Sequence, residues 1–331
     1  MWLPRECQGW ICTRTDGSTC GEFRIIFARQ GGLTSPTGRV LLNFEGELPN
    51  PNPGCGLDAC RPVAELLASL STMSQAAAEN AVESFYFNGL PGFRPVVHPS
   101  NYGMTGDSGV CGPNGGQIRT NQFLIGQQLQ FVWQLHDFKL DRSCAGSTFN
   151  LDIEPAAVIV NPFGPLFSPN PPPLGAAFQA DFINEVSGLA ASSVTDIHMD
   201  PPGIYNAGRS NAQGTENDYG VQLGANNAFS QAISNEVIQI FGSPALTARN
   251  IADRATTQSC AGCHQLSNGV NLGGGLVWPS SLNFVHVNEN GQLSTALTGT
   301  FLPHRLEILT EFLACMPMNI GMPSLGGSMG Q

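Results

Sequence analysis

Charged side chains are scarce in this chain of 331 residues. They make up 12% of it, about half of the share usual in soluble domains, and Lys139 is the only lysine. The formal net charge is −11, and no run of basic residues occurs. Because phosphate binding needs clustered lysine and arginine, this composition excludes a nucleic-acid-binding surface.

Long apolar runs are also lacking. No stretch reaches the roughly 20 apolar residues of a membrane-spanning helix. The first ten residues, MWLPRECQGW, lack the basic start and apolar run of a secretory signal. Yet the chain has 10 cysteines, more than a cytosolic protein usually contains unless they bind metal. We therefore expect a periplasmic or extracellular protein whose precursor signal was removed or lies outside the printed sequence. A reduced cytosolic protein is the alternative.

The apolar patterns predict an α+β fold. We expect a disulfide-tied, β-rich N-terminal region with helices, followed by a small, mainly α-helical domain. Strands are expected at 22–30, 38–46 and 150–163, and an antiparallel pair across 117–140, where polar and apolar residues alternate. We place the domain boundary between residues 245 and 246.

Three later segments predict helices. A proline-rich connector near 161–175 precedes a helix whose apolar stripe runs from Leu174 to Leu189. Two further helices are expected at 228–241 and 247–257. The second of them runs directly into the sequence SCAGCH at residues 259–264.

This short sequence predicts covalent attachment of one haem c. Two thiols spaced by two residues reach the two vinyl groups of a haem, and an imidazole beside the second thiol binds the iron. Cys260 and Cys263 would hold the haem, and His264 would be the proximal ligand. A metal site would need distant partners, since Cys315 is the only later cysteine. A plain Cys260–Cys263 disulfide also remains open.

Residues 246–316 resemble a small class I cytochrome c domain. The resemblance rests on a helix ending in CAGCH, a loop rich in glycine and proline (LGGGLVWPSS), and a closing helix, PHRLEILTEFLACM. It implies a monohaem fold and places Leu306, Leu309 and Leu313 along one side of the last helix, with Pro303 in its first turn. Residues 1–245 resemble no family that we recognise.

The chain departs from the cytochrome pattern at the distal iron ligand. No methionine lies between His264 and Cys315, whereas two histidines do, His286 and His304. Since imidazole is another common strong haem ligand, we expect bis-histidine ligation by His264 and His286, with His304 as the second candidate. The sequence NENG predicts a hairpin turn just after His286.

Eight cysteines remain outside the haem motif, enough for four disulfides. We expect Cys55 to pair with Cys60, because five residues allow a small closed loop. We also expect Cys111 to pair with Cys144, which would tie the two ends of the strand pair together.

The sequence is compatible with three functions. The first is an exported monohaem protein that passes electrons to a redox partner protein and uses its N-terminal region for docking or anchoring. The second is a haem enzyme, of peroxidase or oxygenase type, with an open distal site. The third is an extracellular structural or assembly subunit whose cysteines are all structural, since low charge and abundant Gly and Pro suit self-assembly. No catalytic residue stands out in the sequence.

Overall fold

The computed structural model describes residues 17–32, 34–103, 116–125, 131–145 and 148–314. Its centre is an antiparallel sheet in the order β1-β2-β3-β4-β5, with the short β6 paired to β4. The strands are β1 (Thr19–Ala28), β2 (Val40–Pro49), β3 (Gln117–Ile125), β4 (Phe131–Ala145), β5 (Thr148–Ala156) and β6 (Ser210–Asn211). The predicted strand pair is thus confirmed as β3 and β4, and the fold is mixed α/β.

The two faces of the sheet differ in chemistry. Phe23 on β1 and Leu48 on β2 lie on an apolar face, in a core formed with Val63, Phe85 and Tyr86. The opposite face has a buried polar centre: Arg24 pairs across the strands with Glu45, and Asn43 with Arg119. Buried charges are costly unless they are paired, and these are paired with one another across the strands.

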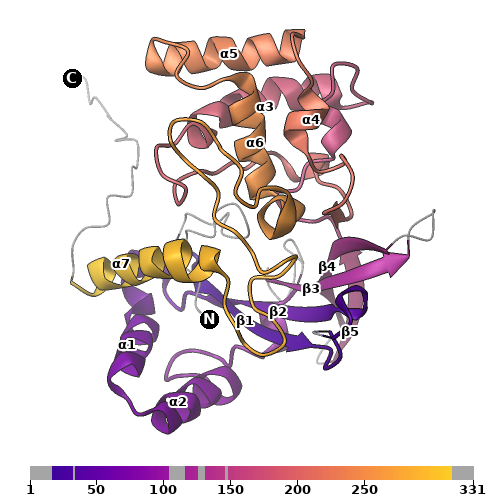
Figure 1. Cartoon of the computed structure of the whole chain (residues 1–331). Helices are drawn as coiled ribbons and strands as arrows, with labels where there is room; N and C mark the ends of the chain where they lie inside the picture. The colour runs from indigo at the N-terminus through magenta and orange to yellow at the C-terminus, as the bar shows by residue number, and fades with distance from the viewer. Residues whose placement is uncertain (1–16, 33, 104–115, 126–130, 146–147, 315–331) are drawn as a thin grey trace.

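The apolar face is covered by α1 (Arg61–Ser69) and α2 (Gln75–Asn88), which lie below the sheet in Figure 1. A disulfide between Cys20 and Cys60 joins β1 to the start of α1. The expected Cys55–Cys60 pairing is therefore wrong: β1 brings Cys20 next to Cys60, a long-range contact that sequence spacing does not reveal. Cys111, and the side chain of Cys144, lie outside the described residues.

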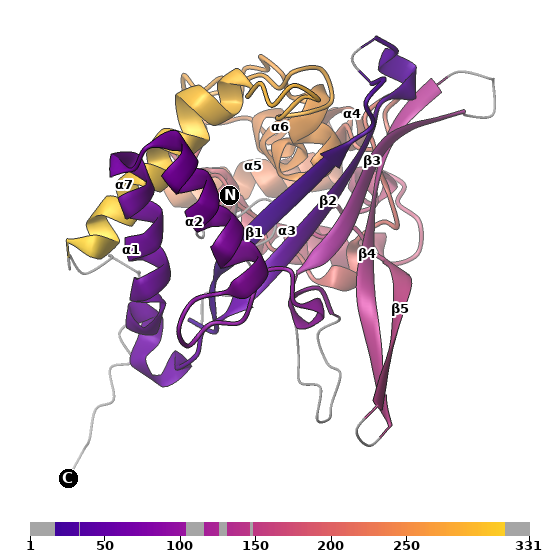
Figure 2. The same ribbon diagram turned by 90° about the horizontal axis from the view of Figure 1, so that it is seen from below.

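Four helices pack above the polar face (Figures 1 and 2). They are α3 (Gly175–Leu189), α4 (Tyr219–Leu223), α5 (Ala228–Phe241) and α6 (Ala248–Gln258). The predicted helices at 228–241 and 247–257 are confirmed, as is the stripe of α3, except that Leu174 is half exposed in a left-handed turn before it. One core joins α3, α5 and α6. The division at residue 245 stays a prediction, and this core contains residues from both sides of it.

The last helix, α7 (Leu302–Leu313), lies beside α1. The Arg61 guanidinium sits 5.2 Å from the centre of the Phe312 ring. Pro303 occupies the first turn, as predicted. The predicted apolar side of the helix is wrong in part: Arg305 and Leu309 are buried, whereas Leu306 is 63% exposed. The cytochrome-like domain at residues 246–316 stays a prediction.

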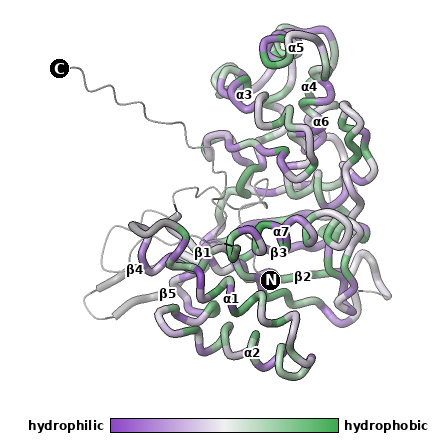
Figure 3. The backbone as a smooth tube through the Cα atoms, turned by 90° about the vertical axis from the view of Figure 1, so that its left-hand side faces the viewer, coloured by the Kyte–Doolittle hydropathy of each residue, from purple (hydrophilic) through white to green (hydrophobic). Residues whose placement is uncertain are grey.

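Hydrophobic and hydrophilic residues alternate along the described helices (Figure 3). Among these helices, none combines the length and the apolar character needed to cross a lipid bilayer.

Candidate haem-attachment site

The two thiols and His264 lie on one tight turn that follows α6. The helix ends at Gln258, Ser259 is extended, and the chain then forms a single π-helical turn over Gly262–Leu266. Such turns occur often at functional sites. The Ser210 hydroxyl on β6 accepts a hydrogen bond from the amide of Ala261 at 2.9 Å, which ties the turn to the sheet.

Both cysteines of the turn are buried, and neither belongs to the described disulfide. Burial raises the pKa of Cys260 to about 12, although the Arg119 guanidinium opposes this shift. Reactive cysteines of thiol–disulfide enzymes have lowered pKa values instead. Cys260 therefore lacks the electrostatic setting of a redox-active pair.

His264 is held in one orientation by a backbone carbonyl. Its Nδ1 lies 2.9 Å from the carbonyl oxygen of Phe284. A carbonyl can only accept, so Nδ1 must bear the hydrogen, and Nε2 keeps its lone pair. Burial, followed by the neighbouring His286, lowers the pKa of His264 well below its usual value. His264 is thus a neutral imidazole, the form that binds iron.

His286 lies next to His264, with the two ring centres 4.9 Å apart. Its Nε2 is 3.2 Å from Cys263 Sγ, and its Nδ1 is 2.9 Å from Ser294 Oγ. Burial lowers the pKa of His286 to about 4, so it too is neutral. His304 lies elsewhere, on α7, where its Nδ1 is 3.7 Å from the carboxylate of Glu307.

A cavity of about 140 Å³ opens between this turn and the polar face of the sheet. Cys263, His264 and His286 line one side, and β1, β2, β3 and α7 line the others. His304 is not among the described residues that line it. The structure therefore brings together three of the predicted site residues around one space, with Cys260 buried close by.

Sequence reasoning missed the part of the cavity wall that the sheet provides. Arg24, Arg119 and Asn121 face the cavity from β1 and β3, and Arg305 faces it from α7. The sequence does contain one signal for these residues, namely charged side chains within the predicted strands. In EFRI, Glu22 and Arg24 alternate with apolar residues. That alternation shows which residues share a face, but not that this face is buried.

The buried ions form one chain across the sheet. Arg24 Nε lies 2.6 Å from Glu22 and 3.3 Å from Glu45, and Arg119 Nε lies 3.4 Å from Glu45 and 2.8 Å from Asp137. Three carboxyl groups thus share two guanidinium groups. Burial, opposed by Arg24, raises the pKa of Glu22 to about 7 from its ordinary value of 4.5.

We expect this buried carboxyl to make unfolding depend on pH. A pKa raised in the folded state contributes stability that is complete below pH 4.5 and is lost as the pH rises through 7. The loss amounts to about 3 kcal/mol. Glu22→Gln should lack this loss, so its stability relative to the unmodified protein should rise between pH 5 and pH 8. Urea unfolding at several pH values measures the difference.

Glu83→Gln is the matched control, because Glu83 is exposed on α2. Its stability should follow that of the unmodified protein at every pH. A constant difference between Glu22→Gln and the unmodified protein over this range would contradict a raised pKa at Glu22.

The turn contains the residue types that attach a haem: two buried thiols at the required spacing and a neutral histidine. Among the described residues, no group of three or more His, Cys, Asp or Glu side chains is placed to hold a metal ion by itself. A haem needs only axial ligands from the protein, because its porphyrin supplies the other four. The cavity volume lies below the roughly 300–1,000 Å³ typical of small-molecule sites, and Cys260 is not among the described residues that line it, so the cavity as it stands does not fit a macrocycle held by both thiols.

Comparison of the chain with protein-family models, with curated proteins and with solved structures finds no match. The geometry of this turn and of the cavity beside it is therefore the ground on which a function is assigned.

Proposed function

We propose that the chain is a monohaem c-type protein that transfers electrons. Cys260 and Cys263 hold the haem covalently, His264 is the proximal ligand and His286 the distal ligand. The haem supplies a one-electron redox centre. The protein fixes the imidazole of His264, buries both thiols and surrounds the site with apolar and paired polar groups.

One observation supports this proposal above the others. The Phe284 carbonyl lies 2.9 Å from Nδ1 of His264, and the turn that contains His264 also contains two buried cysteines. Histidines that bind metals almost always donate their other ring N–H in this way. Export, a redox partner protein and assembly with further copies belong to the same proposal; the Cys20–Cys60 disulfide is compatible with an oxidising compartment.

Intact-mass measurement tests the attachment. The chain, produced together with a haem-attachment system, should gain the mass of one haem and retain it after denaturation and acid–acetone extraction. Cys260→Ala and Cys263→Ala should each weaken that retention, because each removes one of two thioether bonds. Recovery of all the haem by extraction, or the mass of the bare chain, would overturn the proposal.

The contacts of His286 favour a second candidate, a haem enzyme of peroxidase or oxygenase type. Both ring nitrogens of His286 have partners, Cys263 Sγ and Ser294 Oγ, and a histidine that kept these contacts would leave a bound haem able to take up a small ligand. Carbon monoxide separates the two functions. It leaves the spectrum of a reduced, bis-histidine electron carrier unchanged, and it binds at once to a haem with an open distal position.

A further inference from the structure

The cavity beside the polar face of the sheet has the size of a single aromatic ring. Its volume is about 140 Å³, and an engineered apolar cavity of about 150 Å³ binds one benzene molecule. Apolar side chains from the sheet and from the segments that follow the π-helical turn form much of its wall. They include Leu41, Leu135, Val285, Val287, Leu297 and Phe301. An apolar body the size of one ring therefore matches this part of the cavity.

Asn43 on β2 adds a polar group to the wall. Its side chain is 9% exposed, and its Oδ1 has no hydrogen-bond partner among the described residues. A buried amide oxygen without a partner costs free energy, so native proteins rarely keep one. Because Asn43 lines the cavity, a molecule inside it that carries a hydrogen-bond donor supplies the missing partner.

The charges on the sheet side of the cavity do not call for a charged ligand. The guanidinium groups of Arg24 and Arg119 are paired with the carboxylates of the ion chain that crosses the sheet, and Asn43 belongs to none of these pairs. A cation would meet both guanidinium groups, and an anion would compete with the carboxylates that already bind them. A neutral donor is the group that suits the place beside Asn43.

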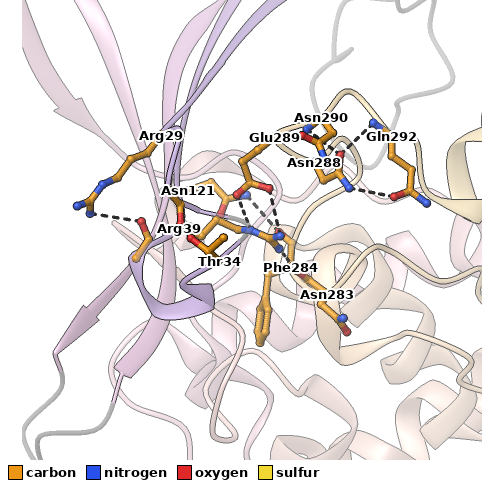
Figure 4. Close-up of polar contacts among 12 residues, drawn as sticks. Arg29, Thr34, Arg39, Asn121, Asn283, Phe284, Asn288, Glu289, Asn290 and Gln292 are labelled. Atoms are coloured by element: carbon orange, nitrogen blue, oxygen red, sulfur yellow. Dashed lines mark hydrogen bonds and ion pairs between the residues drawn. The ribbon is translucent and has the colours of Figure 1, made fainter.

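The loop that closes the cavity is held by Arg39, just before β2, as Figure 4 shows. The NH1 of Arg39 donates to the Asn283 carbonyl at 2.7 Å. Its Nε and NH2 lie 2.8 and 3.2 Å from the carboxylate oxygens of Glu289. These contacts lie on both sides of residues 285–287, which face the cavity, so this part of the wall is fixed at two points.

Asn121 on β3 holds the same loop from the sheet. Its Nδ2 donates to the Phe284 carbonyl at 3.2 Å, and its Oδ1 accepts the indole N–H of Trp133. Phe284 has a φ of 70°, in the left-handed region, which a bulky side chain keeps only where surrounding contacts hold it. The cavity is therefore preformed, as sites for small molecules usually are.

We infer that this cavity is a binding site for a small neutral phenol, a single aromatic ring that carries a hydroxyl group. The ring packs against the apolar wall, and the hydroxyl donates a hydrogen bond to Asn43 Oδ1. A phenol hydroxyl is uncharged at neutral pH, so it does not disturb the ion pairs of the sheet. The site belongs to the chain without haem and does not depend on the proposed function.

Isothermal titration calorimetry of the haem-free chain with phenol and with toluene tests the site. The two molecules have nearly the same shape, but only phenol carries a hydrogen-bond donor. Asn43→Leu keeps the size of the side chain and removes the acceptor. The ratio of phenol affinity to toluene affinity should fall about tenfold in this variant, because the hydroxyl then leaves water without gaining a partner.

Asn101→Leu is the matched control. Asn101 is 1% exposed, donates to the carbonyls of Pro95 and Val96, and is not among the described residues that line the cavity. Its replacement should lower stability and leave the affinity ratio unchanged. Asn43→Leu should be at least as stable as the unmodified protein, because it removes a buried acceptor that lacks a partner.

A second variant keeps the test decisive if Asn43→Leu fails to fold. Leu297→Phe enlarges a side chain that lines the cavity, so it should weaken the binding of both molecules. Absence of phenol binding to the unmodified protein up to millimolar concentrations would overturn the site and leave the cavity to water. An affinity ratio that is the same in the unmodified protein and in Asn43→Leu would overturn the contact between Asn43 and the hydroxyl.

Discussion

Replacing His286 with alanine is expected to convert the ferric haem protein from low spin to high spin and to open it to carbon monoxide after reduction. His286 lines the same cavity as His264, and its low pKa keeps it neutral, the form of histidine that binds iron. Loss of a strong axial ligand weakens the ligand field, and the change is visible in the absorption spectrum.

His304→Ala is the control for this experiment. His304 lies on α7 beside Glu307. Its replacement should leave the spin state and the carbon monoxide response unchanged. The reverse pattern would make His304 the distal ligand. An unchanged spectrum in both variants would assign the distal position to neither histidine and strengthen the enzyme proposal.

Gly262→Ala is expected to destabilise the protein by about 3 kcal/mol and to prevent haem attachment. A Cβ at position 262 would lie 1.7 Å from the backbone oxygen of Thr256 and 2.5 Å from its carbonyl carbon. Both atoms belong to the last turn of α6, so relief requires the turn with Cys260 and Cys263 to move. Urea unfolding and the fraction of chains with covalent haem measure the two effects.

Gly299→Ala provides the comparison. Gly299 lies in the other π-helical turn, Leu297–Phe301, and a Cβ there meets nothing within 4 Å. This variant should be as stable as the unmodified protein or slightly more so, because alanine restricts the unfolded chain. Equal stability of the two alanine variants would show that the Thr256 contact does not constrain the turn.

Local signals in the sequence predicted the regular elements well. The stripe of α3 shows in Phe178, Phe182 and Val186, all fully buried, because helix periodicity depends on nearby residues alone. Capping explains where α6 begins: Thr247 and Asn250 form a reciprocal capping box. The thiol spacing and His264 are equally local, and so they could be read directly.

Contacts between distant segments could not be predicted in this way. Asn121 and Phe284 are 163 residues apart, and no spacing rule relates them. The same holds for Cys20 and Cys60, whose pairing follows from the course of β1. On α7, leucine spacing suggested an apolar side, but Arg305 is buried there because it forms part of the cavity wall, a contact with distant segments that the spacing does not show.

The Cys20–Cys60 disulfide requires two oxidised cysteines, whereas the proposed haem attachment requires two reduced ones in the same chain. It closes a loop of 40 residues, worth about 4 kcal/mol by chain-entropy arguments, so folding benefits when these two cysteines are oxidised. Cys260 and Cys263 must stay reduced to bond a haem. In the folded protein, burial protects them from thiol exchange, since both are at most 3% exposed. In the unfolded chain all four of these thiols are exposed to the same oxidant. Whether disulfide formation or haem attachment comes first therefore decides which sulfur atoms are joined.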